Sequence, residues 1–296
     1  MIKILKQRGK PKSLAQRIVF GIVFVLFAAY AFSMIYTGIF AVVSALKTHD
    51  EFVEFMFEWP KEWLFKNFID AFELIKLNVG RGVTVDLWGM LYNSVWYTIG
   101  STFLGIACST TLAYVVSKYR FVGRNAIYTT SLVIMILPIV GSLPAQFKLI
   151  KGVLEIDNSP LLLITSCNGF GFNFIVLYGF FQSLSWSYAE AAFIDGASDF
   201  RTFLEVMLPQ AMPAVTSLVI LSAIGVWNDY QGPILYLNRM PTIAVGLYEF
   251  KTNAIYEMNL PALFAGLVIS ILPVLVLFII FQETIMSNTV AGGLKG

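Results

Sequence analysis

The sequence predicts an all-α, polytopic membrane protein with six transmembrane helices. Its 296 residues are 57% hydrophobic and only 13% charged, and the mean hydropathy is +0.75. A soluble domain is nearer half apolar and about a quarter charged, so the excess apolar surface is best explained by contact with lipid. The net charge of +2 is small and gives no indication of a nucleic-acid partner.

Six apolar segments have roughly the length of about 20 residues that a helix needs to cross the hydrocarbon core. Pro138 and Pro144 interrupt the third and Pro233 interrupts the fifth. Membrane helices tolerate proline where neighbouring groups bind the freed carbonyls. The six predicted spans are Ile18–Leu46, Leu91–Ser117, Ile127–Phe147, Leu161–Ser183, Ala214–Leu237 and Ala262–Ile285.

The first span follows a basic flank and ends near a Val-Ser-Ala sequence that resembles a signal-peptide cleavage site. Its apolar run is much longer than the roughly 7–15 residues of a signal-peptide core. We therefore interpret residues 18–46 as a retained transmembrane helix.

The distribution of Lys and Arg predicts that both termini are cytoplasmic. The N-terminal tail and the segment after the second span carry basic residues and no acids, whereas the loop after the first span has more acids than bases. The basic residues are Lys3, Lys6, Arg8, Lys10, Lys12 and Arg17 in the tail, and Lys118, Arg120 and Arg124 in the segment. The chain then divides into a cytoplasmic tail (1–17), a first helix (18–46), an extracytoplasmic loop (47–89), a five-helix core (90–286) and a cytoplasmic tail (287–296).

Part of the extracytoplasmic loop, residues 59–76, is amphipathic. This pattern predicts one or two short helices lying at the outer membrane surface, with Trp59 and Trp63 at the interface.

Small residues recur every four positions in the second span, which predicts a helix face that packs closely. The positions are Ser101, Gly105, Ser109, Ala113 and Ser117, and the sixth span repeats the pattern at Ala262, Gly266 and Ser270. Tight packing within one subunit is the simpler interpretation, and a subunit interface is the alternative.

The cytoplasmic loop 184–213 predicts a helix–turn–helix. Ser187 and Glu190 have the spacing of a capping box, and Gly196 can take the left-handed conformation that ends a helix. Ser198 or Asp199 can cap a second short helix that runs to Met207, Leu208-Pro209 ends it, and Pro213 starts the next span. Exposed apolar residues on this loop predict a docking surface: Ala191, Ala192, Ile194, Phe200 and Phe203.

The same loop resembles the EAA motif of permease subunits of bacterial ATP-binding-cassette importers. That motif reads Glu-Ala-Ala, three residues, Gly, nine residues, Ile, one residue, Leu-Pro. Here the matching residues are Glu190-Ala191-Ala192, Gly196 and Leu208-Pro209, with Val206 in place of Ile. Asn93-Ser94, "YRFVGR", "WNDYQGP" and the C-terminal "AGGLKG" are similar to the carbohydrate branch, the MalG-like permeases.

The resemblance implies a MetI-like, type I importer fold in a bacterial cell membrane and transport by alternating access. It implies three partners besides the lipid bilayer: a second homologous permease, a cytoplasmic ATPase dimer and an extracytoplasmic sugar-binding protein. It also implies that the loop couples to the ATPase through Glu190, Ala191, Ala192, Asp195, Gly196, Leu208 and Pro209. The C-terminal tail is expected to reach towards the ATPase interface, or to be a disordered terminus.

The chain is not expected to hydrolyse ATP or to bind a cofactor. The sequence has no phosphate-binding G-x-x-x-x-G-K-[ST] motif, because Lys12-Ser13, Lys47-Thr48 and Lys251-Thr252 all lack the preceding glycine. ATP and Mg are therefore expected on the partner ATPase. Cys108, Cys167 and the single His49 predict neither a disulfide framework nor a metal site, and no catalytic residue is predicted.

A substrate pathway is predicted near the end of the fifth span. Asp229 is an ionisable residue within an apolar segment, which marks a candidate functional site. Its neighbours Trp227, Asn228, Tyr230 and Gln231 offer rings and hydrogen-bonding groups that suit a sugar, and Asn168 and Asn173 could line the same cavity. Alternatively, Asp229 packs at a helix break and never meets substrate, and the sugar contacts lie mainly on the partner permease.

Three other functions compete with a sugar importer. An importer of another solute, such as glycerol phosphate, would favour basic residues along the path. An integral-membrane enzyme would need clustered catalytic residues at membrane depth. A channel or scaffold without an ATPase is disfavoured by the motif from Glu190 to Pro209.

Overall fold

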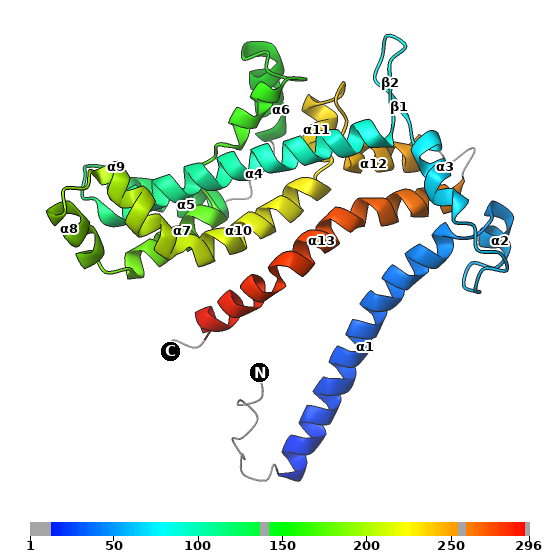
Figure 1. Ribbon diagram of the computed structural model, residues 1–296, viewed down its shortest axis with the longest axis horizontal. Coiled ribbons are helices and arrows are strands. Elements are labelled where there is room, and N and C mark those ends of the chain that lie inside the picture. Colours follow the sequence, from blue (N-terminus) through cyan, green and yellow to red (C-terminus); the bar gives the residue numbers. More distant parts are fainter. Residues whose placement is uncertain (1–12, 137–141, 254–258, 294–296) are drawn as a thin grey trace.

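The computed structural model describes residues 13–136, 142–253 and 259–293 of the chain (Figure 1). Within this part the protein is helical apart from one small hairpin. The basic residues at positions 3, 6, 8, 10 and 12, Pro138 and the last three residues lie outside the described part.

Among the described residues, four helices are long and apolar enough to cross a membrane. They are α1 (Leu14–Ala45), α4 (Leu87–Lys118), the helix formed by α9 (Asp199–Thr202), η3 (Phe203–Met207) and α10 (Leu208–Asn228), and α13 (Leu260–Gly293). They correspond to the first, second, fifth and sixth predicted spans. Helix α13 continues through most of the predicted C-terminal tail.

The third and fourth predicted spans consist of shorter segments. The third contains α5 (Arg124–Ile136) and α6 (Ser142–Phe147), followed by the π-helix η1 (Lys148–Val153). The fourth is divided into the 3₁₀ segment η2 (Pro160–Ser166) and α7 (Phe172–Ser183). These segments are compatible with six membrane crossings.

The fifth predicted span ends earlier than Leu237, because α10 stops at Asn228 and a separate helix, α11 (Gln231–Tyr236), follows. The next helix, α12 (Ile243–Asn253), was not predicted from the sequence.

Helix α4 is the central element and packs along α7 and α10 (Figure 1). Its stripe of small residues is buried: Ala113 is fully covered and Ser109 is 1% exposed. A Cβ on Gly105 would lie 3.1 Å from the carbonyl oxygen of Ser166. The stripe therefore serves close packing within this chain, as the simpler interpretation expected.

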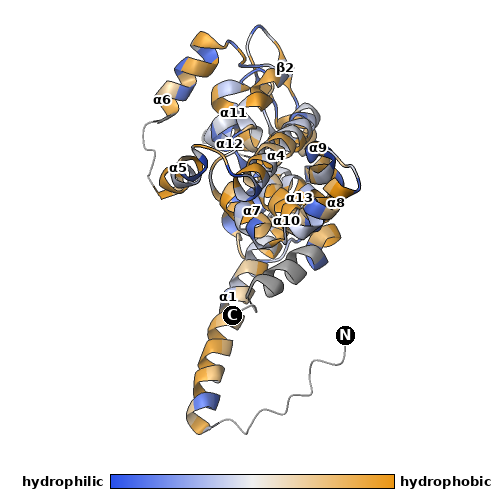
Figure 2. Ribbon diagram, turned by 90° about the vertical axis from the view of Figure 1, so that its left-hand side faces the viewer, coloured by the Kyte–Doolittle hydropathy of each residue, from blue (hydrophilic) through white to orange (hydrophobic). Residues whose placement is uncertain are grey.

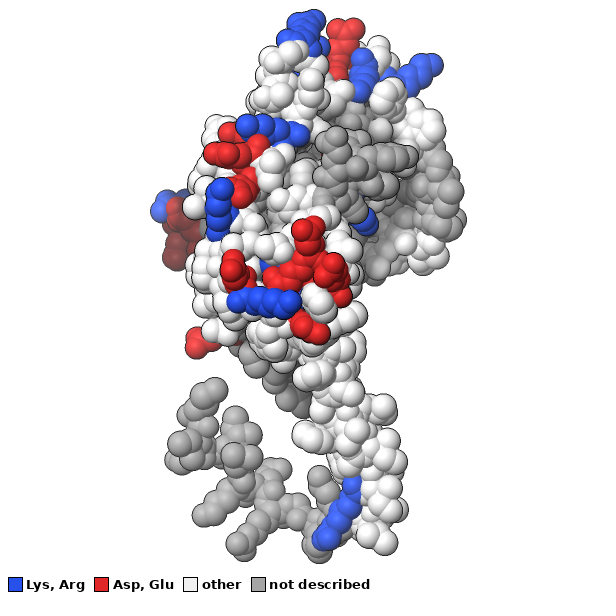
Figure 3. Space-filling view, turned by 90° about the vertical axis from the view of Figure 1, so that its right-hand side faces the viewer, with Lys and Arg blue, Asp and Glu red and all other residues white. Residues whose placement is uncertain are grey.

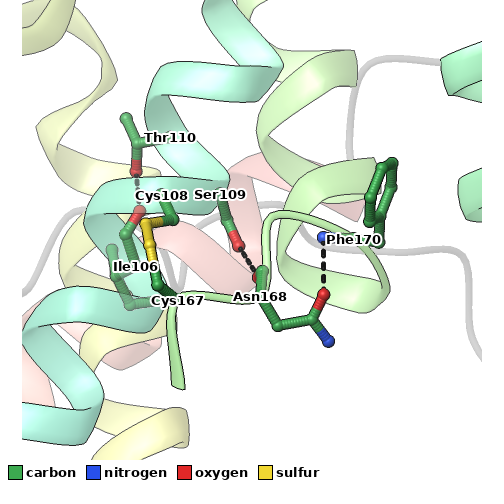
Figure 4. The surroundings of a disulfide bond; sticks show 7 residues. All are labelled: Ile106, Cys108, Ser109, Thr110, Cys167, Asn168 and Phe170. Atoms are coloured by element: carbon green, nitrogen blue, oxygen red, sulfur yellow. Dashed lines mark hydrogen bonds between the residues drawn. A yellow bond between two sulfur atoms is a disulfide. The ribbon is translucent and has the colours of Figure 1, made fainter. Parts of the chain in front are cut away.

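A disulfide joins Cys108 of α4 to Cys167, which precedes α7 (Figure 4). The Cα atoms are 5.5 Å apart although the residues are separated by 59 positions. No sequence pattern indicated that these two cysteines pair. Their spacing carries no signal, because the packing of α4 against the segment before α7 brings them together.

The first helix projects from the rest of the molecule and is apolar along its length (Figure 2). Ser13 and Gln16 form a capping box at its start: the Ser13 hydroxyl accepts from the Gln16 amide at 3.3 Å, and the Ser13 amide donates to the Gln16 side chain at 3.1 Å. Ser44 and Ala45 at its far end are buried, while most of its large apolar side chains are exposed. This surface suits lipid or another membrane subunit.

The loop between α1 and α4 forms a folded cap at one end of the molecule. It contains α2 (His49–Glu54), α3 (Lys66–Leu74) and the antiparallel strands β1 (Leu77–Asn78) and β2 (Thr84–Val85). Buried Lys47 donates to the carbonyls of Phe55 and Met56 at 2.7 and 3.0 Å. Figure 3 shows acidic and basic side chains over this end, whereas the projecting helix carries very few.

Candidate functional site

The predicted helix–turn–helix is present at the end of the molecule opposite the cap (Figure 1). Helix α8 (Ser187–Ile194) ends where Gly196 takes a φ of +82°. The amide of Ala197 donates to the carbonyl of Ala192 at 2.9 Å, and the amide of Gly196 donates to that of Phe193 at 3.0 Å. These two bonds form a Schellman motif, so the predicted left-handed turn at Gly196 is confirmed.

The predicted capping box at Ser187 and Glu190 is absent. Trp186 is the N-cap of α8, and the Glu190 amide donates to the Trp186 carbonyl at 3.1 Å. The Ser187 hydroxyl instead lies 2.7 Å from that of Ser185, and the Ser187 amide donates to Ser185 at 3.3 Å. Ser187 is thus the first residue of the helix, and no side chain forms a capping hydrogen bond at its start.

The second helix of the loop does not end at Leu208-Pro209. Ser198 caps it as predicted, accepting from the Arg201 amide at 3.4 Å. The chain then stays helical from Asp199 to Asn228, with Pro213 inside α10. The π-helical turn Phe203–Met207 widens the helix directly before Pro209, and such turns are frequent at functional sites. The second helix of the loop and the membrane helix are therefore one continuous helix.

The exposed surface of the loop is partly apolar. Ile194 is 86% and Phe200 is 71% exposed, and Glu190, Ala191 and Asp195 are exposed beside them. Ala192 and Phe203, which were expected on this surface, are each only 8% exposed and contribute to the core. Their burial fixes the loop to the body of the protein.

Aromatic contacts anchor α8 and α9 to the end of α4. The ring of Tyr119 packs edge-on against that of Trp186, with centroids 5.8 Å apart, and Trp186 packs against Phe193 at 5.9 Å. The Tyr119 hydroxyl donates to the carboxylate of Asp199 at 2.7 Å. Burial and this hydrogen bond raise the pKa of Tyr119 above its usual value of about 10, so the phenol remains a donor at neutral pH.

A lysine connects α4 to the start of the loop. The Lys118 ammonium donates to the carbonyl of Leu184 at 2.6 Å, where α7 has ended and α8 has not begun. Movement of the loop would therefore be transmitted to α4 as well as to α10.

The second candidate site is a pocket of about 250 Å³ between α10, α12 and α13. Three residues of the predicted substrate pathway line it: Trp227, Asn228 and Tyr230. The Trp227 indole donates to the Ser270 carbonyl at 3.0 Å, which fixes the ring. The remaining lining residues are Ile243, Ala244, Leu247, Tyr248, Lys251, Leu263, Leu267 and Ser270.

Asp229 and Gln231 lie beside this pocket and do not line it. The Asp229 carboxylate accepts from the amides of Gln231 and Gly232 at 2.9 and 3.3 Å, and so caps the start of α11. These contacts are the ones expected of a residue at a helix break.

The two predicted asparagines of the fourth span lie outside the pocket. Asn168 accepts from the Phe170 amide at 3.1 Å next to the disulfide (Figure 4), and Asn173 donates to the Ser222 hydroxyl at 3.2 Å. The first shapes a loop and the second connects α7 to α10. The structure does not bring them together with Trp227.

Sequence reasoning missed Tyr248 and Lys251, since α12 was not predicted. The signal was available in the spacing of Ala244, Leu247, Tyr248 and Lys251, which recur on one face of a helix. No cluster of three or more His, Cys, Asp or Glu that could hold a metal occurs among the described residues.

Comparison with known families identifies the fold. Residues 80–286 match the family described as "Binding-protein-dependent transport system inner membrane component". The chain belongs to this family. It is therefore a multi-pass membrane permease subunit of a binding-protein-dependent transport system. Such a subunit is a transport component and is not itself an enzyme.

Curated permeases resemble this one over most of their length. The diacetylchitobiose uptake system permease protein NgcG of Streptomyces coelicolor is 28% identical over 257 residues, which cover 86% of this chain and 82% of that protein. The arabinooligosaccharides transport system permease protein AraQ of Bacillus subtilis is 31% identical, over 69% of this chain and 73% of that one.

A solved structure has the same fold. It is the crystal structure of a bacterial ABC transporter involved in the import of the acidic polysaccharide alginate. One of its chains superposes with a TM-score of 0.77 at 22% identity, covering 93% of this permease and 99% of that chain. The MetI-like importer fold implied by the motif is thereby confirmed.

Proposed function

We propose that this permease imports a sugar by alternating access, as one of two permease subunits driven by a separate ATPase dimer. An extracytoplasmic binding protein delivers the sugar to the capped end of the molecule. The chain itself holds no cofactor, and ATP and Mg bind to the ATPase. Both termini and the loop 184–213 face the cytoplasm.

The observation that carries this proposal is the exposed helix–turn–helix at residues 187–207, here called the knob. Ile194 and Phe200 expose apolar side chains outside the membrane-spanning helices, where no lipid would cover them. An exposed apolar surface at such a place is typical of a protein-binding site. Because α9, η3 and α10 are continuous, a push on this knob moves a whole membrane helix. Such a surface suits the binding of a cytoplasmic ATPase. The proposed coupling residues are Glu190, Ala191, Asp195, Gly196, Leu208 and Pro209, and buried Ala192 holds them in place from within the core.

Sugar as substrate is supported by two independent observations. The similar permeases NgcG and AraQ bear the names of oligosaccharide uptake systems. The pocket at Trp227 combines aromatic rings with an amide side chain, and rings stack well on the C–H face of a pyranose because their faces are electron-rich. Trp227, Asn228 and Tyr230 are the proposed pathway residues of this subunit. Asp229 and Gln231 do not line the pocket, and the hydrogen bond between them holds the backbone beside it.

The test is whether the knob binds and couples an ATPase. The permease is co-expressed with its neighbouring permease and ATPase, purified in detergent through a tag on this chain, and assayed for bound ATPase and for ATP-driven sugar uptake in proteoliposomes. Ile194→Asp and Phe200→Asp should each weaken ATPase binding about tenfold or more, since burying such a side chain is worth about 1.5–3 kcal/mol.

Val83→Asp is the matched control, because Val83 is also an exposed apolar residue but lies at the opposite end. It should leave ATPase binding unchanged. Normal ATPase binding by both loop variants, in protein that remains folded, would contradict the coupling role and favour a channel or scaffold.

A further inference from the structure

The pocket between α10, α12 and α13 contains a cation that a neutral sugar does not need. Lys251 lies one helical turn beyond Tyr248, so both side chains project from the same face of α12. No Asp or Glu is among the lining residues, and no described residue forms an ion pair with Lys251.

The pocket also contains an ordered aromatic surface. The rings of Tyr230 and Tyr248 are stacked with centroids 4.7 Å apart and planes 16° from parallel. Each ring therefore holds the other in place, and Trp227 behind them is fixed by its bond to Ser270. Asn228 uses an N–H to bond the Ile224 carbonyl at 2.8 Å, which leaves its side-chain oxygen as an acceptor within the described part of the chain.

A second hollow at the same end of the molecule has the same sign of charge. It measures about 650 Å³ and is lined by Asn78, Val79, Gly80, Arg81, Val83, Asn238 and Arg239. The loop that carries Arg239 leads directly into α12. Cations without lining acids therefore occur both at this outer hollow and in the aromatic pocket, an arrangement that favours anions.

We propose that the aromatic pocket binds one acidic saccharide unit, with its ring on the tyrosine pair and its carboxylate on Lys251. The volume of about 250 Å³ is below the roughly 300–1,000 Å³ of drug-sized sites, which suits one unit of a longer chain. This inference rests on the proposed sugar import and adds the class of sugar: a hexuronic-acid oligosaccharide. Lys251, Tyr230 and Tyr248 are the specificity-determining residues in this permease.

The test measures binding to the purified complex of both permeases and the ATPase in nanodiscs, without the binding protein. The two probes are a tetrasaccharide of 1,4-linked hexuronic acid and its neutral, carboxyl-reduced counterpart of the same length. The unmodified complex should prefer the acidic probe. Lys251→Gln should weaken binding of the acidic probe about fivefold, the size expected of an exposed ion pair, and should change binding of the neutral probe less than twofold.

Two further variants separate charge from structure. Lys251→Arg should retain the preference for the acidic probe. Lys76→Gln removes the same charge from an exposed position outside the pocket and should change neither affinity. Equal affinity of the unmodified complex for both probes, binding of neither, or an equal effect of Lys251→Gln on both would overturn the assignment.

Uptake assays separate this proposal from the proposed function. ATP-driven import of a neutral oligosaccharide, together with no acidic preference in binding, would remove only the acidic class. Failure to import any saccharide with a bound, active ATPase would remove the sugar importer itself.

Discussion

Gly196 shows how one residue sets the shape of the loop. Its φ of +82° lies where a Cβ costs about 1–2 kcal/mol, and open space surrounds the position where that Cβ would lie. A side chain at position 196 would therefore cost backbone strain but would cause no steric clash. Gly196→Val should reduce ATP-driven uptake strongly and Gly196→Ala moderately, while Gly196→Asn should retain most activity because Asn tolerates the left-handed conformation.

The measurement is uptake per ATP hydrolysed in proteoliposomes. Gly179→Ala is the matched control, since Gly179 lies inside α7 with open space around it and an ordinary helical φ. Equal activity of the Val, Ala and Asn variants would show that the turn at Gly196 is not required for coupling.

At the same scale, the sequence predicted some side-chain roles and missed others. The turn at Gly196 was predictable, because a glycine placed after a short helical pattern has a strong conformational reason to be there. The capping box was wrong because the Ser187 amide donates to the Ser185 hydroxyl and the Glu190 amide donates to the Trp186 carbonyl. The position of Lys251 was unpredictable without α12, since a lysine in a polar segment looks like any solvated charge.

At the scale of elements, apolar length predicts the long helices well and the short ones poorly. Helices α1, α4, α10 and α13 coincide with predicted spans because lipid demands long apolar runs. The predicted helix end at Leu208-Pro209 was wrong, because a π-helical turn precedes Pro209 and the helix continues through it. The disulfide depends on the packing of α4 against the segment before α7, which sequence spacing does not encode.

The contact between α4 and the loop gives a prediction at this scale. Lys118→Met keeps the length of the side chain but leaves the Leu184 carbonyl without its donor, at a cost of about 1 kcal/mol. We expect faster hydrogen exchange of the amides in 184–196 and weaker coupling of ATP hydrolysis to uptake. Lys118→Arg should restore both. An equal increase of exchange in α13 would indicate general destabilisation in place of a local loosening of the loop.

At the scale of the whole molecule, two ends with different character are separated by the long helices. One end carries α8 and α9, and the other carries the cap with α2, α3 and the hairpin, together with α11 and α12 (Figure 1). The Lys and Arg counts predict that the end with α8 and α9 faces the cytoplasm, which stays a prediction. The sequence could not place the aromatic pocket at the cap end, because that position follows from how α12 packs against α4 and α13.

This two-ended arrangement makes the membrane orientation testable by cysteine labelling. Because Cys108 and Cys167 are paired, no native thiol competes with an introduced one. Arg81→Cys lies in the hairpin turn and Val122→Cys lies between α4 and α5, where Val122 is 103% exposed. In cells whose cytoplasmic membrane is intact and accessible from outside, a membrane-impermeant maleimide should label position 81. It should label position 122 only after the cytoplasmic membrane is permeabilised. The reverse pattern would place the knob outside the cell, where no ATPase could reach it, and the positive-inside assignment would be wrong.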